Sequence, residues 1–138
     1  LVKAPLYHTC IFTNSAGLES IEYLLSELPE VHVTILAPTD FAESVVDMQR
    51  FLNLSIYPNF SPFNKKETLD KMDFYLDINH GGVVGTIIEE IHGKNKPIFA
   101  FDTTSHDSSG RSQIFSSAEP EKMVEEIRKF LGEKLNGK

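Results

Sequence analysis

The apolar residues of this 138-residue chain switch repeatedly between two spacings. Short runs rich in β-branched and aromatic residues alternate with longer stretches in which apolar residues recur at helical spacing. The first pattern indicates buried strands and the second indicates amphipathic helices. Strands that alternate with helices in this way predict an α/β fold, with a parallel sheet covered by helices on both faces.

The strand pattern occurs six times, at residues 6–13, 31–36, 54–57, 73–78, 97–101 and 113–115. Helices are predicted at 18–28, 40–50, 84–91 and from Pro120 to about 135, with a loop and short helix over 61–71. Because crossover connections are right-handed, the sequence favours a doubly wound, Rossmann-like sheet with strand order 3-2-1-4-5-6.

Composition narrows the class of protein further. Hydrophobic residues make up 41% of the chain and charged residues 24%, which fits one folded domain over residues 1–138. No apolar run approaches the roughly 18 residues that a membrane span needs, and no signal peptide is recognisable. The net charge of −7 argues against nucleic acid or an anionic membrane as the main partner.

Cys10 and Leu1 each indicate something about the setting of the chain. Cys10 lies in an apolar strand pattern, which predicts core packing and fits a cytoplasmic, reducing compartment. The chain begins with Leu1 instead of Met, which indicates a fragment of a longer protein.

The loop after the fourth strand is the first candidate binding element. Open parallel sheets bind ligands beyond the carboxyl ends of their strands, where the strand order reverses. Here Asn79, His80, Gly81 and Gly82 precede a predicted helix. The glycines allow close approach to the backbone, and a helix start suits a phosphate. The same residues also fit a plain glycine turn, in which His80 only caps the helix or packs on the loop. A full dinucleotide fingerprint and a Walker loop are both missing.

Polar residues in other segments are further candidates. Asn14 and Ser15 follow the first strand, where they either contact a phosphate or cap a helix. Asp102 ends the fifth strand and either binds a hydroxyl or caps its loop. Glu90 lies on the flank of the helix at 84–91, where it either reaches a ribose or remains solvated. His106 and Asp107 have no third partner at a suitable spacing, so neither a metal nor a cofactor is predicted.

Residues 57–102 carry a resemblance to a known family. The matching features are the motif YPNFSP, the strand and loop YLDINHGG, and the strand KPIFAFD. This segment resembles the C-terminal, donor-binding half of GT-B-type glycosyltransferases. It is especially similar to the B-type glycosyltransferase subunit of the streptococcal accessory Sec system and to related proteins that glycosylate serine-rich adhesins.

The resemblance implies a UDP-sugar donor, with Glu90 at the position of the second of two family glutamates. Gly82 occupies the position of the first glutamate, and residues 13–19 lack the basic residues that usually hold the diphosphate. Nearby substitutes are Lys65, Lys66 and Arg111. These departures fit either a divergent enzyme or a silent subunit that holds a partner glycosyltransferase or a Ser/Thr-rich protein acceptor.

Two expectations follow for the chain itself. Its predicted strands and helices supply a complete two-sided core, so we expect it to fold alone. In a GT-B enzyme the reaction takes place between two domains, so we expect this chain alone not to transfer sugar. No catalytic residue is assigned from the sequence. A nucleotide-sugar epimerase or synthetase is disfavoured by the missing dinucleotide fingerprint.

Overall fold

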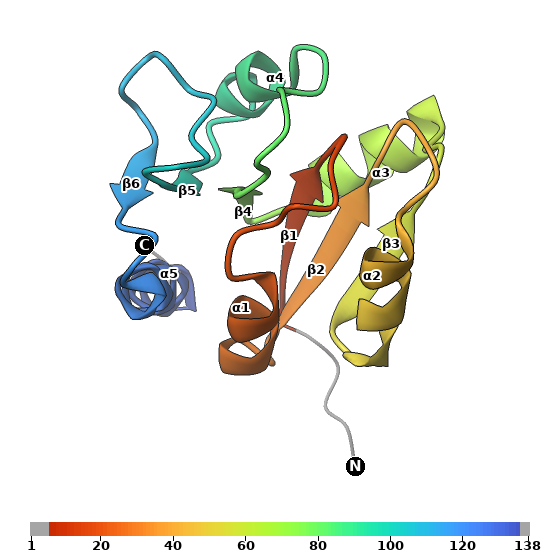
Figure 1. Cartoon of the computed structure of the whole chain (residues 1–138). Helices are drawn as coiled ribbons and strands as arrows, with labels where there is room; N and C mark the ends of the chain where they lie inside the picture. The colour runs from red at the N-terminus through yellow and green to blue at the C-terminus, as the bar shows by residue number, and fades with distance from the viewer. Residues whose placement is uncertain (1–5, 136–138) are drawn as a thin grey trace.

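One parallel sheet organises the computed structural model, which describes residues 6–135 and therefore does not include Leu1. Its strands follow the order β3-β2-β1-β4-β5-β6, and every neighbouring pair is parallel. The six strands are β1 (Tyr7–Phe12), β2 (Val31–Leu36), β3 (Leu54–Tyr57), β4 (Phe74–Asp77), β5 (Ile98–Phe101) and β6 (Gln113–Phe115). The predicted strand order is confirmed, and the strand order reverses between β1 and β4 at the centre of the sheet (Figure 1).

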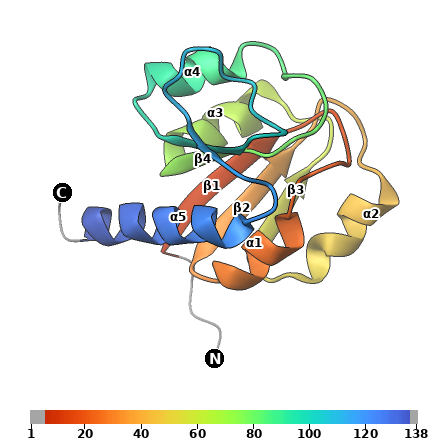
Figure 2. The same ribbon diagram turned by 60° about the vertical axis from the view of Figure 1, so that its left-hand side comes forward.

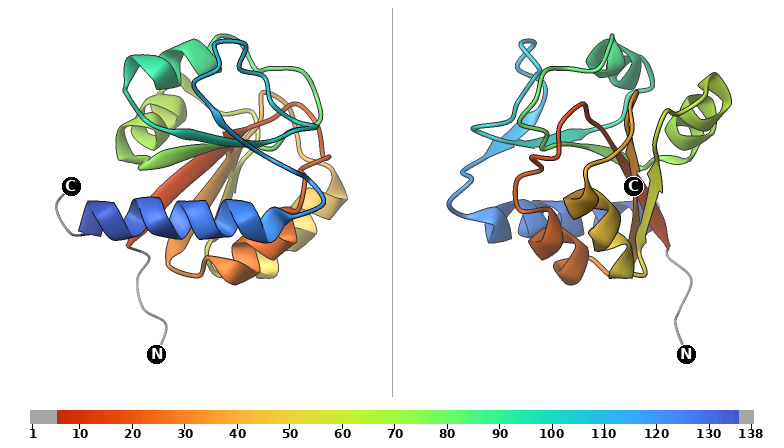
Figure 3. Two further views of the ribbon diagram at one scale, coloured as in Figure 1. Left: turned by 90° about the vertical axis from the view of Figure 1, so that its left-hand side faces the viewer. Right: turned by 45° about the vertical axis from the view of Figure 1, so that its right-hand side comes forward.

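Helices cover both faces of the sheet. They are α1 (Ile21–Glu27), α2 (Glu43–Val46), the 3₁₀ segment η1 (Asp47–Arg50), α3 (Pro62–Lys71), α4 (Ile87–Gly93) and α5 (Pro120–Leu135). Helices α1, α2 and α5 lie on one face, and α3 and α4 lie on the other (Figures 2 and 3). Within residues 6–135, no helix is long and apolar enough to span a bilayer.

The face under α1, α2 and α5 holds the larger apolar core. Strand residues such as Ile11 and Phe99 pack there with Leu24 of α1, and α5 contributes Met123, Val124, Ile127 and Leu131. The helix predicted from Pro120 to about 135 is therefore confirmed. The Phe74 and Phe99 rings meet edge to face at 5.5 Å, which adds an aromatic contact beneath α5.

The face under α3 and α4 holds the second core. Cys10 and Tyr75 of the sheet pack against Leu69 of α3 and against Ile88 and Ile91 of α4. Cys10 is fully buried, and burial raises the pKa of its thiol far above the ordinary value. The core-packing prediction for Cys10 is confirmed.

Three helices begin later than the sequence predicts. Helix α1 begins at Ile21 instead of residue 18, because the Leu18 backbone forms an antiparallel bridge with Asn79. Helix α2 begins at Glu43 instead of residue 40 and passes directly into the 3₁₀ segment η1. Helix α4 begins at Ile87 instead of residue 84, after Gly85 adopts a left-handed φ of 57° that a helix cannot continue. Residues 78–86 therefore form a long loop at the carboxyl edge of the sheet.

Candidate functional site

The loops after β1 and β4 are joined at the point where the strand order reverses. The His80 amide donates to the Gly17 carbonyl at 2.9 Å, and the Glu19 amide donates to the Ile78 carbonyl at 2.9 Å. These bonds lie on either side of the bridge between Leu18 and Asn79. The structure thus brings together the two loops on which the predicted phosphate contacts lie.

Asn79 is the internal connector of this region. Its side chain is buried, and its Oδ1 accepts from the Thr13 hydroxyl at 2.7 Å and from the Gly81 amide at 2.9 Å. Its Nδ2 donates to the Gly82 carbonyl at 3.0 Å. Because both ends of the amide bind the protein itself, Asn79 shapes the loop that presents its neighbours.

The two glycines of the loop differ in their surroundings. A Cβ atom on Gly81 would overlap Oδ1 of Asn14 and lie 2.9 Å from Cβ of Ser15. On Gly82, the nearest atom to a Cβ would be Nδ2 of Asn14 at 3.7 Å, and this residue is exposed. Gly81 is therefore required by the close approach of the protein's own β1 loop, whereas the backbone of Gly82 faces outward.

The other candidate residues of these two loops, His80, Asn14 and Ser15, are at least partly accessible to solvent. The His80 ring lies with Nε2 2.9 Å from Oε1 of Glu19, and its side chain is 41% exposed. Ser15 accepts the Gly17 amide at 2.9 Å, and Asn14 is exposed. Asn14 and Ser15 line a cavity of about 180 Å³ together with Asp40 and other residues of the loop after β2.

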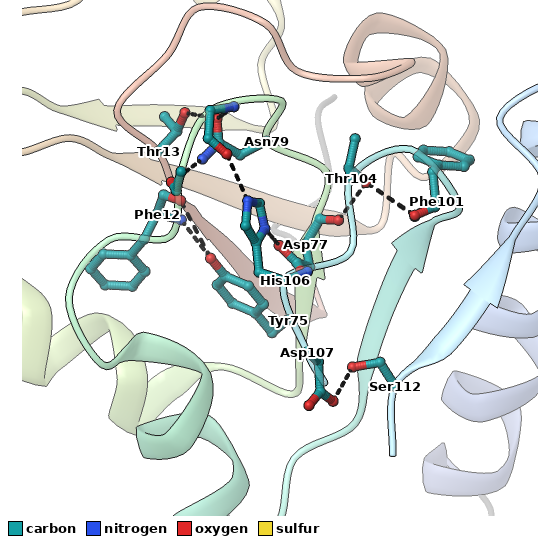
Figure 4. A network of polar contacts seen from close by, with 12 residues as sticks. Phe12, Thr13, Tyr75, Asp77, Asn79, Phe101, Thr104, His106, Asp107 and Ser112 are labelled. Atoms are coloured by element: carbon teal, nitrogen blue, oxygen red, sulfur yellow. Dashed lines mark hydrogen bonds and ion pairs between the residues drawn. The ribbon is translucent and has the colours of Figure 1, made fainter. Parts of the chain in front are cut away.

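A second network connects β4 with the loop after β5 (Figure 4). Asp77 ends β4 and is buried, with 3% of its surface exposed. Its Oδ2 accepts the backbone amide of His106 at 2.7 Å, and its Oδ1 lies 2.6 Å from Nδ1 of the His106 ring. The other ring nitrogen, Nε2, lies 2.6 Å from the carbonyl oxygen of Gly81. The Thr104 hydroxyl donates to the Asp77 carbonyl at 2.8 Å and fixes the same loop.

The surroundings of Asp77 and His106 raise the pKa of both groups. Burial raises the pKa of Asp77, and the hydrogen bonds from His106 oppose that effect without cancelling it. Burial alone would lower the pKa of His106, but its hydrogen bonds to Asp77 and Gly81 outweigh burial and raise it. Both shifts favour the protonated forms, so the pair holds its shared proton more strongly than the separate groups would.

Asp107 and His92 form a separate pair. Burial would raise the pKa of Asp107, but hydrogen bonds from Ser112, Ser109 and His92 lower it far below the usual value. Its carboxylate lies 3.0 Å from Nε2 of His92, at the end of α4. His106 and Asp107 thus contact different partners, and among residues 6–135 no group of three or more histidine, cysteine or acidic side chains is placed to hold a metal ion.

Glu90 lies on the α3 side of the sheet. Its Oε2 accepts from Nζ of Lys65 at 2.9 Å and from the Thr86 hydroxyl at 3.1 Å. The pair of Lys65 and Glu90 borders a cavity of about 340 Å³ between α3 and α4, which Lys66 also lines. The predicted flank position of Glu90 is confirmed, and Glu89 is exposed.

Two other candidate residues, Asp102 and Arg111, form hydrogen bonds within the loops on either side of β6. Oδ1 of Asp102 accepts the Ser117 amide at 3.1 Å, so this side chain caps the loop. Arg111 donates from its backbone amide to the Ser109 hydroxyl at 3.3 Å. Of the three basic residues suggested by the sequence, Lys65 is the one that contacts Glu90.

Sequence reasoning missed Asp77 as a site residue and assigned no partner to His106. The signal was present in the sequence, because an aspartate inside the apolar strand FYLDI must be paired when it is buried. The partner was not predictable, because it lies 29 positions away on another loop.

The fold and this carboxyl edge define a Rossmann-like α/β class. Comparison with known proteins then gives the family: the GftB/GlyA-F C-terminal domain matches residues 9–137, and the chain belongs to this family. The resemblance seen in residues 57–102 is therefore confirmed as membership of this domain family.

Three known proteins illustrate the relationship. Glycosyltransferase GlyB of Streptococcus pneumoniae serotype 4 is 54% identical over 133 residues, which cover 96% of this chain and 33% of GlyB. The crystal structure of apo-form glycosyltransferase GlyE from S. pneumoniae TIGR4 aligns with a TM-score of 0.86 and 36% identity, over 93% of this chain and 34% of GlyE.

The third is the UDP-N-acetylglucosamine–peptide N-acetylglucosaminyltransferase stabilizing protein GtfB of Streptococcus agalactiae. It is 35% identical over 96 residues, which cover 70% of this chain and 22% of GtfB. The chain spans about a third of the length of GlyB and less of GtfB, so it corresponds to only part of these relatives.

Proposed function

We propose that this chain is the C-terminal, donor-binding domain of a GT-B-type glycosyltransferase. In this proposal it binds a UDP-sugar at the carboxyl edge of the sheet, for transfer to a protein or glycan acceptor. The observation that carries the proposal is the 54% identity to a named glycosyltransferase over 96% of the chain. The geometry supports it, because the joined loops after β1 and β4 lie where open parallel sheets bind ligands.

The edge offers suitable contacts for a diphosphate. Gly82 presents exposed backbone, and Asn14 and His80 carry exposed polar side chains beside it. Their loops are already fixed by Asn79, so little conformational entropy remains to be lost on binding. Helix α4 begins at Ile87, three residues after its predicted start, and is short, so the proposal relies on these loop groups instead of the helix dipole.

Glu90 and Lys65 offer contacts for the rest of the nucleotide. Both hydrogen bonds of the Glu90 carboxylate use Oε2, and its side chain is 35% exposed. A ribose hydroxyl can therefore donate to this carboxylate without breaking the existing bonds. The Lys65 ammonium beside it supplies a positive charge that residues 13–19 lack.

A second candidate function is that of a silent subunit. It is favoured by the similarity to GtfB, whose name describes the stabilisation of a transferase. Gly82 in place of the first family glutamate, and the absence of Lys or Arg from residues 13–19, point the same way. Such a subunit would hold a partner glycosyltransferase or a Ser/Thr-rich acceptor. In either case we propose a cytoplasmic location, where an unpaired thiol such as Cys10 remains reduced.

Calorimetric titration separates the two candidates. UDP and UDP-N-acetylglucosamine are titrated into the wild-type chain and into the variants Glu90→Gln and Glu89→Gln. Donor binding predicts saturable heat for the wild type, about tenfold weaker binding for Glu90→Gln, and no change for Glu89→Gln, its exposed neighbour. A folded wild-type chain that gives no saturable heat at millimolar nucleotide rejects donor binding. Co-purification with a catalytic glycosyltransferase whose activity is unaffected by Glu90→Ala then supports the silent subunit.

A further inference from the structure

The His106 ring connects a buried carboxylate with the candidate binding loop. Nδ1 lies 2.6 Å from Asp77, and Nε2 lies 2.6 Å from the carbonyl oxygen of Gly81. The side chain of His106 is 17% exposed and that of Asp77 is 3% exposed, so water screens the contacts only weakly. His106 comes from the loop after β5, yet it contacts the middle of the loop after β4 (Figure 4).

The two contacts together determine the number of protons. A carbonyl oxygen only accepts hydrogen bonds, so Nε2 must carry a proton toward Gly81. The contact between Nδ1 and Asp77 then needs a second proton, whether it resides on the imidazole or on the carboxyl group. A neutral histidine beside an ionised Asp77 would leave one nitrogen lone pair facing an oxygen at 2.6 Å, which is repulsive.

Few other charges act on this pair. Asp107 also raises the pKa of Asp77, although its own carboxylate is directed to His92, Ser109 and Ser112. On the loop that the ring contacts, His80 is bound to Glu19 across the junction with the β1 loop. When one of the two protons is lost, the remaining ring proton can satisfy Asp77 or the Gly81 carbonyl but not both.

We propose that His106 is a positioning residue: through a proton shared with Asp77 it holds residues 79–82 in the donor-binding conformation, and nucleotide affinity falls when that proton is lost at alkaline pH. This inference rests on the proposed donor-binding function. It assigns to the site a regulating group that touches the loop and not the donor.

The mechanism follows from the way the Gly81 residue is held. Asn79 accepts the Gly81 amide at 2.9 Å, and His106 binds the Gly81 carbonyl. The residue is thus fixed on both sides, and this orients the exposed backbone of Gly82 that follows. Loss of the proton turns the contact between Nε2 or Nδ1 and its oxygen into repulsion, so the peptide after Gly81 is released.

The test compares dissociation constants for UDP between about pH 7 and about pH 9, above the ordinary histidine pKa of about 6.5. We expect wild-type affinity to fall about tenfold over this range, the equivalent of one charge-assisted hydrogen bond. His106→Gln keeps an amide donor for Gly81 but cannot titrate, so its affinity should change less with pH. His106→Ala should bind about tenfold more weakly at both pH values. His92→Gln alters the other pair and should retain the wild-type profile.

An equal pH profile in the wild type and His106→Gln, with wild-type affinity in His106→Ala, overturns the inference. Thermal unfolding of each variant confirms that it is folded. If the wild type binds no nucleotide at all, the proposed function fails, and NMR without ligand decides this inference separately. The Gly81 amide shift should follow the His106 titration in the wild type and stay constant in His106→Gln. A Gly81 amide that ignores this titration contradicts the positioning role.

Discussion

The two histidine–aspartate pairs of this protein have similar ion-pair distances and different surroundings. Asp77 ends a central strand, and both of its oxygens contact a single residue, His106. Asp107 lies in a loop and accepts from His92, Ser109 and Ser112. The partner histidines differ as well, because both ring nitrogens of His106 face oxygens, whereas His92 contacts Asp107 through Nε2.

This difference separates two uses of the same residue types. The pair of Asp107 and His92 joins the end of α4 to the loop after β5, and several hydroxyls stabilise its carboxylate. The pair of Asp77 and His106 shares a proton and contacts the loop after β4 through Gly81. We therefore expect the contribution of Asp107 and His92 to stability to fall in acid, and that of Asp77 and His106 to fall in alkali.

Removal of each carboxylate should have the largest effect. Asp77→Ala leaves His106 without its partner beside the sheet and should lower the free energy of unfolding by about 2–4 kcal/mol. Asp107→Ala should cost about 1–2 kcal/mol, because the exposed Ser109 and the partly exposed Ser112 can bind water instead. Urea unfolding at neutral pH measures both values. Equal losses would show that the two pairs are structurally equivalent.

A methyl group in the binding loop should have the next largest effect. Gly81→Ala places a Cβ against Ser15 and Asn14 and should cost about 1–3 kcal/mol, because the β1 loop must move. Gly82→Ala meets only an ordinary contact at 3.7 Å and should change stability by less than about 0.5 kcal/mol. Thermal unfolding of the two variants compares them directly. A tolerated Gly81→Ala would mean that the two loops are not held together in solution.

The dependence of stability on pH distinguishes the pairs further. The pKa of His106 is raised in the folded chain, so its contribution is complete below the unfolded value of about 6.5. The contribution is lost as pH rises through the folded value, at up to about 1.4 kcal/mol per pH unit. The stability difference between wild type and His106→Gln should therefore shrink from about pH 6 to about pH 9. A constant difference would argue against the shared proton.

Asp107 should show the opposite dependence. Its pKa is lowered in the folded chain, so its contribution is present above the unfolded value of about 3.9 and is lost as pH falls toward the folded value. The stability advantage of the wild type over Asp107→Asn should therefore decrease in acid and remain constant between about pH 6 and about pH 9. Urea titrations across that series measure it, and an advantage that grows in acid would refute this assignment.

The half-buried pair of Lys65 and Glu90 should have the smallest effect on stability. Its side chains are 34% and 35% exposed, and such pairs contribute about 0–1 kcal/mol. Glu90→Gln should therefore unfold almost as the wild type does, while it weakens nucleotide binding. A large loss of stability in Glu90→Gln would instead assign this glutamate to the packing of α4 on α3.

Strand order was predictable because it depends on local patterns and on one rule of handedness. The runs LYHTCIFT and VHVTIL form β1 and β2, and the alternation with helices led to the observed order. Helix starts at the carboxyl edge were predicted less well. The bridge between Leu18 and Asn79 is a long-range contact that competes with helix formation, and no local pattern reports it.

The candidate site shows the same division. The positions of Asn14, Ser15 and Asn79 at one edge followed from strand ends, and the flank position of Glu90 followed from helical periodicity. The ring of His106 reaches Gly81 across 25 positions of the chain, through a loop without regular structure. Such contacts depend on tertiary packing, so the sequence alone placed His106 at the carboxyl edge without a partner and gave no support for a metal site there.

The central claim is that the carboxyl edge of this sheet binds a nucleotide, and chemical-shift mapping tests it most directly. UDP is titrated into the isotope-labelled 138-residue chain, and backbone amide shifts are followed to saturation. The account predicts saturable shifts at Asn14, His80, Gly81 and Gly82, with residues 128–132 of α5, which lie beside the start of β1, unchanged. Saturable shifts confined to other surfaces, or none at millimolar UDP in a folded sample, would contradict it.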